Sequence, residues 1–162
     1  MAGSRLGKYS LFAAIFFWGI IIGGITYTHI VYFPPYLSDL PDSAVIVTGK
    51  YGLSEGRFWM MIHPILILSL ITALVLNWKA KPRRSLILWS VGIYFVVLVC
   101  TQLYFLPELG AFRESASSGV TPAEWLARGN RWQYLSWIRG AFMYAGFLPL
   151  LSALTKTGDI SD

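Results

Sequence analysis

Two histidines and one arginine lie inside long apolar stretches of this chain. His29, His63 and Arg139 each fall several residues inside a block of apolar residues. An ionisable side chain in such a setting costs free energy, so each of the three is a candidate functional residue. Histidine can act as a general base or ligate a metal or haem iron, and arginine can stabilise negative charge on an oxygen. We therefore expect His63, His29 and Arg139 to be catalytic residues.

Further polar side chains are expected at a similar depth. If the first apolar block ends before Pro34, His29 lies about four residues inside it, or about 6 Å. His63 lies about six residues after Arg57, or about 9 Å inside the second block. The opposite halves of the blocks are mostly aliphatic and aromatic, so the polar groups predict a ligand site near one end of the helices. Its substrate-binding candidates are Arg57, Thr101, Gln102, Glu108, Trp132 and Trp137.

The fourth block shows this pattern most clearly. Trp132 and Arg139 are seven residues apart, and Ser136 between them lies on the same face of a helix. Such a face can stack and hydrogen-bond a planar ligand, with Trp132 and Trp137 against its rings. Arg139 lies about 12 Å inside the block, so its guanidinium needs a ligand oxygen or a buried acid as a partner. The nearest candidate acid is Glu108.

The two histidines leave three interpretations open. On adjacent antiparallel helices at similar depth, His29 and His63 could ligate one haem or metal ion. Either could instead be a catalytic base or a substrate contact. Each could also make only a structural hydrogen bond between helices.

Composition indicates a membrane protein of the all-α class. The 162 residues are 56% hydrophobic and 13% charged, whereas soluble domains carry about 25% charged residues. Each of four apolar blocks is long enough to cross a bilayer core of about 30 Å. We expect one domain over residues 1–162, an antiparallel up-down bundle of four transmembrane helices with two long outer loops, 34–57 and 107–131. The predicted helices cover about residues 11–33, 58–78, 86–106 and 132–154.

Charge distribution predicts the orientation of this bundle. Basic residues near the ends of membrane helices favour the cytoplasmic side. We therefore place both termini in the cytoplasm and the protein in the inner or plasma membrane. Thr121 to Glu124 has the pattern of a helix start, with a Pro at the first helical position, so a short helix is expected over residues 122–128. The residues that set the orientation are Arg5, Lys8, Lys79, Lys81, Arg83, Arg84 and Lys156.

Short motifs lie near the ends of the blocks: Val31-Tyr32-Phe33-Pro34, Leu37, Leu40-Pro41, Arg57-Phe58-Trp59, Thr101, Phe105-Leu106-Pro107, Arg131-Trp132 and Ile138-Arg139. Together they resemble the anthrone oxygenase-like (DUF1772) family of small four-helix membrane proteins. The resemblance extends over nearly the whole chain. It implies a four-helix membrane fold and, from some members, cofactor-independent oxygenation of an anthrone to an anthraquinone.

These observations favour a membrane-embedded, oxidoreductase-like protein that binds a planar hydrophobic molecule such as a polycyclic phenol or quinone. In an anthrone-type reaction, His63 or His29 would remove a proton and Arg139 would stabilise the resulting enolate oxygen without a cofactor. One alternative is an electron-transfer subunit that binds haem or a metal ion through His29 and His63. Another is a non-catalytic subunit of a larger membrane complex or homo-oligomer. The basic residues are few and scattered, so no nucleic-acid partner is expected.

Overall fold

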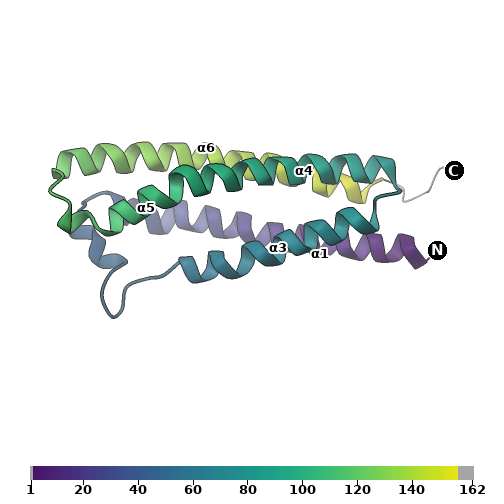
Figure 1. The fold of residues 1–162 in the computed structure, drawn as a ribbon, viewed down its shortest axis with the longest axis horizontal. Coiled ribbons are helices and arrows are strands. Elements are labelled where there is room, and N and C mark those ends of the chain that lie inside the picture. The colour runs from purple at the N-terminus through teal and green to yellow at the C-terminus, as the bar shows by residue number, and fades with distance from the viewer. Residues whose placement is uncertain (1, 157–162) are drawn as a thin grey trace.

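A computed structural model of the protein describes residues 2–156, and all regular structure within them is helical. The predicted all-α four-helix bundle is confirmed (Figure 1). Its long helices are α1 (Ala2–Tyr27), α3 (Gly56–Leu76), α4 (Lys81–Cys100) and α6 (Pro122–Leu154). Helix α1 packs against α3 and α6, and α4 packs against α6 and α3, which closes the bundle. The start of α1 and the end of α6 lie at one end of the bundle, which we call the terminal end, and we call the opposite end the distal end (Figure 1).

Two of the helices continue further than the sequence predicted. Helix α1 runs through a π-helical turn (Thr28–Tyr32) into α2 (Phe33–Leu37). Helix α4 likewise runs through a π-helical turn (Thr101–Phe105) into α5 (Leu106–Arg113). The expected ends before Pro34 and at Leu106 are therefore wrong. Pro34 and Pro107 lie in the first turn of α2 and α5. A proline is tolerated there, because the backbone N–H groups of a first helical turn need no partner within the helix.

Helix α6 also differs from its prediction. The expected short helix over residues 122–128 is the first part of one continuous helix of 33 residues. The hydroxyl of Thr121 accepts a hydrogen bond from the backbone N–H of Glu124, whose carboxylate accepts one from the N–H of Thr121. This capping box starts the helix as predicted, and no proline lies between Pro122 and the apolar block, so the helix continues without a break.

The long helices extend the bundle beyond a membrane. Three helical segments of 33 residues are each about 50 Å long, which exceeds a hydrocarbon core of about 30 Å. Apart from the apolar core between the long helices, a second apolar core lies at the distal end of the bundle. It is enclosed by α2, α5, the first turns of α6 and the 3₁₀ turns Asp42–Ile46 and Ser115–Ser117. The two long connections are thus largely helical. This core contains Phe33, Tyr36, Leu37, Leu40, Ala44, Val47, Phe105, Phe112, Trp125 and Trp132.

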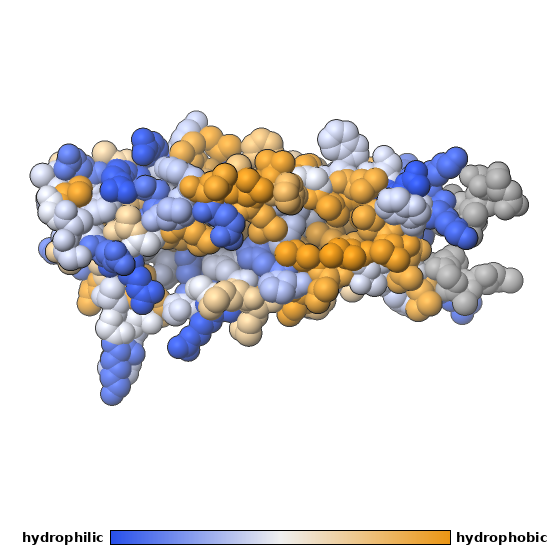
Figure 2. Space-filling view, in the orientation of Figure 1, coloured by the Kyte–Doolittle hydropathy of each residue, from blue (hydrophilic) through white to orange (hydrophobic). Residues whose placement is uncertain are grey.

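The outer surface of the bundle matches a bilayer. Four helical segments are long and apolar enough to cross a membrane. On the face shown in Figure 2, apolar side chains concentrate along the middle of the bundle, and hydrophilic side chains gather at its two ends. The chain has the properties of a multi-pass membrane protein.

Candidate functional site

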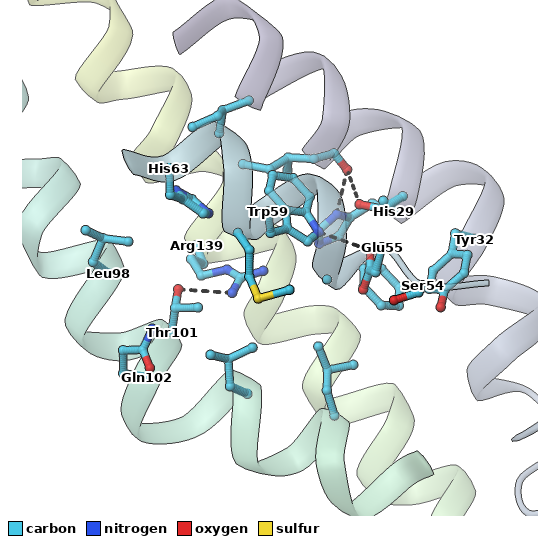
Figure 3. A pocket seen from close by; sticks show the side chains of 18 of the residues that line it. His29, Tyr32, Ser54, Glu55, Trp59, His63, Leu98, Thr101, Gln102 and Arg139 are labelled. Atoms are coloured by element: carbon cyan, nitrogen blue, oxygen red, sulfur yellow. Dashed lines mark hydrogen bonds between the residues drawn. The ribbon is translucent and has the colours of Figure 1, made fainter. Parts of the chain in front are cut away.

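A cavity of about 690 Å³ lies among the helices in the distal half of the bundle (Figure 3). All four helical segments contribute to its wall, which is largely apolar. Ligand pockets in proteins commonly occupy about 300–1,000 Å³ and combine apolar walls with a few polar groups. This distal cavity therefore has the size and lining of a small-molecule site.

The two π-helical turns form opposite parts of its wall. Thr28, His29 and Tyr32 come from the first turn, and Thr101 and Gln102 come from the second. A π-helical turn adds a residue to the helix and rotates the side chains beyond it, and such turns occur often at functional sites. Here they direct polar side chains into the space between the helices.

Arg139 of α6 points into the bundle, as predicted from its depth. Its guanidinium donates hydrogen bonds to the Thr101 hydroxyl at 3.2 Å and to the Ser136 hydroxyl at 2.8 Å. One face of the group lies 4.1 Å from the centre of the Phe105 ring. These two hydrogen bonds leave other guanidinium N–H groups for a ligand oxygen.

Glu108 is not the partner of Arg139, and this prediction is wrong. The Glu108 carboxylate forms a bidentate ion pair with Arg128, with a shortest distance of 2.8 Å. Both residues lie toward the distal end of the bundle, because α5 continues past Pro107 alongside the first turns of α6. Within residues 2–156 this is the one ion pair, so Arg139 lines the cavity without a carboxylate in contact.

His29 and Ser136 hold the guanidinium through a directed chain of hydrogen bonds. His29 Nδ1 lies 2.7 Å from the Ile25 carbonyl oxygen, which only accepts, so Nδ1 carries the proton. His29 Nε2 lies 2.8 Å from the Ser136 hydroxyl. Since Arg139 can only donate to that hydroxyl, the Ser136 O–H donates its own hydrogen bond to Nε2, which carries no proton. The hydrogen bonds from Arg139 to Ser136, from Ser136 to His29 and from His29 to the Ile25 carbonyl thus all run in one direction.

His63 has a different environment. Its Nδ1 lies 2.6 Å from the Tyr94 hydroxyl, and its ring stacks on Trp59 with centroids 5.6 Å apart. Its Nε2 has no hydrogen-bond partner in the described part of the chain, and the residue lines the cavity. When Nδ1 donates to Tyr94, the Nε2 lone pair is available to a ligand.

Glu55 belongs to this site although the sequence did not point to it. It precedes α3, lines the cavity, and accepts a hydrogen bond from Trp59 Nε1 at 3.2 Å. Burial raises the pKa of the Glu55 carboxyl, and the Trp59 hydrogen bond and the charge of Arg139 offset part of that rise. An acidic residue directly before a helix indicates only a helix start, so the sequence carries no signal that identifies Glu55 as a site residue. Tyr32, Tyr36, Ser54, Trp59 and Arg113 also line the cavity unpredicted.

The structure brings together six of the predicted site residues and leaves three outside. Arg57, Glu108 and Trp137 do not line the cavity, and Trp137, which is 41% exposed, contacts the His29 ring from outside it. Trp132 is fully buried and donates its indole N–H to the Phe105 carbonyl at 3.1 Å. The six that line the wall are His29, His63, Thr101, Gln102, Trp132 and Arg139.

The shared haem or metal site has little geometric support. Both ring nitrogens of His29 are already hydrogen-bonded, so ligation would break the chain that holds Arg139. Among the residues that the structure describes, no three His, Cys, Asp or Glu side chains form a group that could hold a metal ion.

Comparison of the chain with protein-family models, with curated proteins and with solved structures finds no match.

Proposed function

We propose that this protein is a membrane-embedded enzyme that binds a planar, lipid-soluble molecule with an ionisable oxygen in the distal cavity. The observation that carries the proposal is the Arg139 guanidinium, which lines an apolar cavity without a contacting carboxylate. A buried cation favours a negatively charged partner, and a phenolate or enolate oxygen would supply that charge. The apolar wall and the aromatic side chains Trp59 and Trp132 suit the rings of such a molecule.

The reaction best suited to these groups starts with proton abstraction. His63 Nε2 removes a proton from a methylene carbon that is conjugated with a carbonyl group through the fused rings, and the electron pair moves through those rings onto the oxygen held by Arg139. In an anthrone-type reaction the resulting carbanion then reacts with dioxygen, and overall one CH₂ group and O₂ give one C=O group and water. His29 acts at a distance in this scheme by positioning Ser136 and Arg139.

Binding is tested with 2-hydroxyanthraquinone, whose visible absorption moves to longer wavelength when its phenol ionises. The protein in lipid nanodiscs is titrated at a pH where the free dye is neutral. A guanidinium next to the oxygen stabilises the phenolate, so we expect a red shift that saturates with wild-type protein and is absent with Arg139→Met. Arg131→Met removes an exposed arginine of the same helix and serves as the control. An equal shift with wild type and Arg139→Met would overturn the proposed role of Arg139.

Catalysis is tested separately by deuterium uptake at the methylene carbon of anthrone in D₂O under nitrogen. We expect His63→Gln to slow this exchange by about 100-fold or more, the usual contribution of a general base, while the dye still binds. Uptake at the wild-type rate by a folded His63→Gln variant would exclude His63 as the base.

A further inference from the structure

The distal cavity opens sideways as well as toward the distal end. Several of its lining side chains are also exposed on the flank of the bundle, including Met60 of α3 at 72% and Leu106 of α5 at 47%. Helices α3 and α4 diverge toward the distal end, where α4 continues into α5 (Figure 1), and the surface is hollowed between them (Figure 2). We call this gap, with Met60 and Pro64 on one side and Leu98, Gln102 and Leu106 on the other, the lateral opening.

The lateral opening and the distal end of the cavity differ in polarity. Four of the five residues of the lateral opening are apolar, and they belong to segments that are apolar enough to cross a membrane. The distal end of the cavity, which we call the distal mouth, is lined by Leu53, Ser54, Glu55 and Arg113, of which two are ionisable. A hydrocarbon chain would be favoured in the lateral opening and disfavoured between charged side chains at the distal mouth.

Gln102 is the exception in the lateral opening. It is exposed on the flank of the bundle and lines the cavity, and Figure 3 shows it on the same helical turn as Thr101. Its amide forms no hydrogen bond within residues 2–156. An amide that faces lipid without a partner costs free energy, so a polar group of a ligand at this position would offset that cost.

We infer that the ligand is an amphiphile that reaches the cavity from the bilayer: a planar phenol or quinone ring with a hydrocarbon tail. The ring lies beside Arg139 and His63, a ring oxygen accepts from Gln102, and the tail leaves between Met60 and Leu106 into the lipid. This inference rests on the proposed function, because it assumes that the ring binds in the distal cavity. To that function it adds the hydrocarbon tail of the ligand, its entry from the bilayer through the lateral opening, and the hydrogen bond from Gln102 to a ring oxygen.

The experiment compares 2-hydroxyanthraquinone with the same dye carrying a dodecyl chain, using protein in phosphatidylcholine vesicles. Met60→Trp/Leu106→Trp narrows the lateral opening, and Leu53→Trp/Ser54→Trp, at exposed positions of the distal mouth, is the matched control. We expect the lateral variant to weaken the visible shift of the tailed dye by about tenfold or more and to leave the tailless dye unchanged. The distal variant should leave the tailed dye unchanged.

The outcomes separate the two proposals. If the tailed dye binds wild type and the lateral variant equally well, the lateral route is wrong while the proposed function stands. If neither dye shifts with wild type, the proposed function fails and this inference fails with it. Should the double variant not fold, single Leu106→Trp tests the route of the tail with the two dyes, and Gln102→Leu tests the ring contact, which both dyes share; both positions are exposed. Unchanged affinity for the tailed dye in both variants would overturn the inference.

Discussion

Ser136 connects two functional groups that are distant in the sequence, His29 on α1 and Arg139 on α6. It is fully buried, so each of its hydrogen bonds is made away from water. Removing the hydroxyl leaves His29 Nε2 without a donor and Arg139 with one acceptor fewer.

Ser136→Ala should therefore destabilise the protein by about 1–3 kcal/mol, the cost of an unpaired buried polar group. It should also weaken binding of 2-hydroxyanthraquinone, because the guanidinium is no longer held in place. Thermal unfolding in detergent and dye titration measure the two effects. Ser152→Ala is the control on the same helix, since that exposed hydroxyl bonds only to the carbonyl of Leu148. Equal stability of the two variants would contradict the role given to Ser136.

Glu55 gives a prediction about pH. Its pKa in the folded protein is raised by burial, so the folded state holds this proton more tightly than the unfolded state. Stability therefore falls as pH rises from the ordinary carboxyl pKa of about 4 through the raised pKa of Glu55 in the folded protein. Glu55→Gln does not titrate and still offers an oxygen to Trp59.

We expect the melting temperature of Glu55→Gln, relative to wild type, to rise with pH over this window and then to level off. Melting curves between about pH 4 and pH 8 measure it, with Glu114→Gln as a control at an exposed glutamate. A difference that stays constant across the window would show that burial does not act on Glu55 in this way.

At the scale of elements, the packing of α1 on α3 sets the position of Trp59, which stacks on His63. The close contact between α1 and the aromatic side chains of α3 depends on Gly24. A Cβ at Gly24 would lie 2.8 Å from Cε1 of Phe58 and 3.1 Å from Cη2 of Trp59, whereas a Cβ at Gly23 would meet nothing within 4 Å.

Adjacent glycines of one helix should thus respond in opposite ways. Gly24→Ala should lower stability by about 1–3 kcal/mol through overpacking, and Gly23→Ala should be neutral or stabilise by up to about 1 kcal/mol through helix propensity. Thermal unfolding of both variants measures this. A loss of stability at Gly23 as large as that at Gly24 would mean that the close approach of the two helices is not the cause.

At the scale of the whole molecule, the basic turn between α3 and α4 lies at the terminal end of the bundle. There the Asn77 amide donates to the Gly7 carbonyl at 2.9 Å, and Arg83 donates to the Lys156 carbonyl at 3.0 Å. These bonds tie Gly7 and Lys156 to the same turn, so the start of α1, the end of α6 and the basic residues of the turn lie at one end of the bundle.

We predict that this end of the bundle faces the cytoplasm, from the bias of basic residues. In a Cys100→Ala background, which removes the single cysteine, an impermeant thiol reagent added outside the cell should label Ser117→Cys and leave Ser85→Cys unlabelled. Both positions are exposed, at opposite ends of the bundle. The reverse labelling pattern would require the opposite orientation.

The amino-acid sequence by itself determined the four helices and the level of the site. Hydrophobic length is a local property, and a rise of about 1.5 Å per residue converts sequence position into depth. That arithmetic placed Arg139 and Thr101 at a similar depth, and the free-energy cost of a guanidinium that faces lipid predicted that Arg139 points inward. The 3.2 Å hydrogen bond between the two residues confirms both predictions.

Only the tertiary structure decided which side chains meet. Depth does not fix rotation about a helix axis, and one added residue rotates every later side chain of the helix by about 100°. The π-helical turns at Thr28–Tyr32 and Thr101–Phe105 make such a change in two of the four walls. The continuation of α5 then directs Glu108 to Arg128, and the approach of α3 to α1 brings Glu55 to the cavity. These positions depend on how the helices pack against one another, which residue spacing within any one helix does not specify.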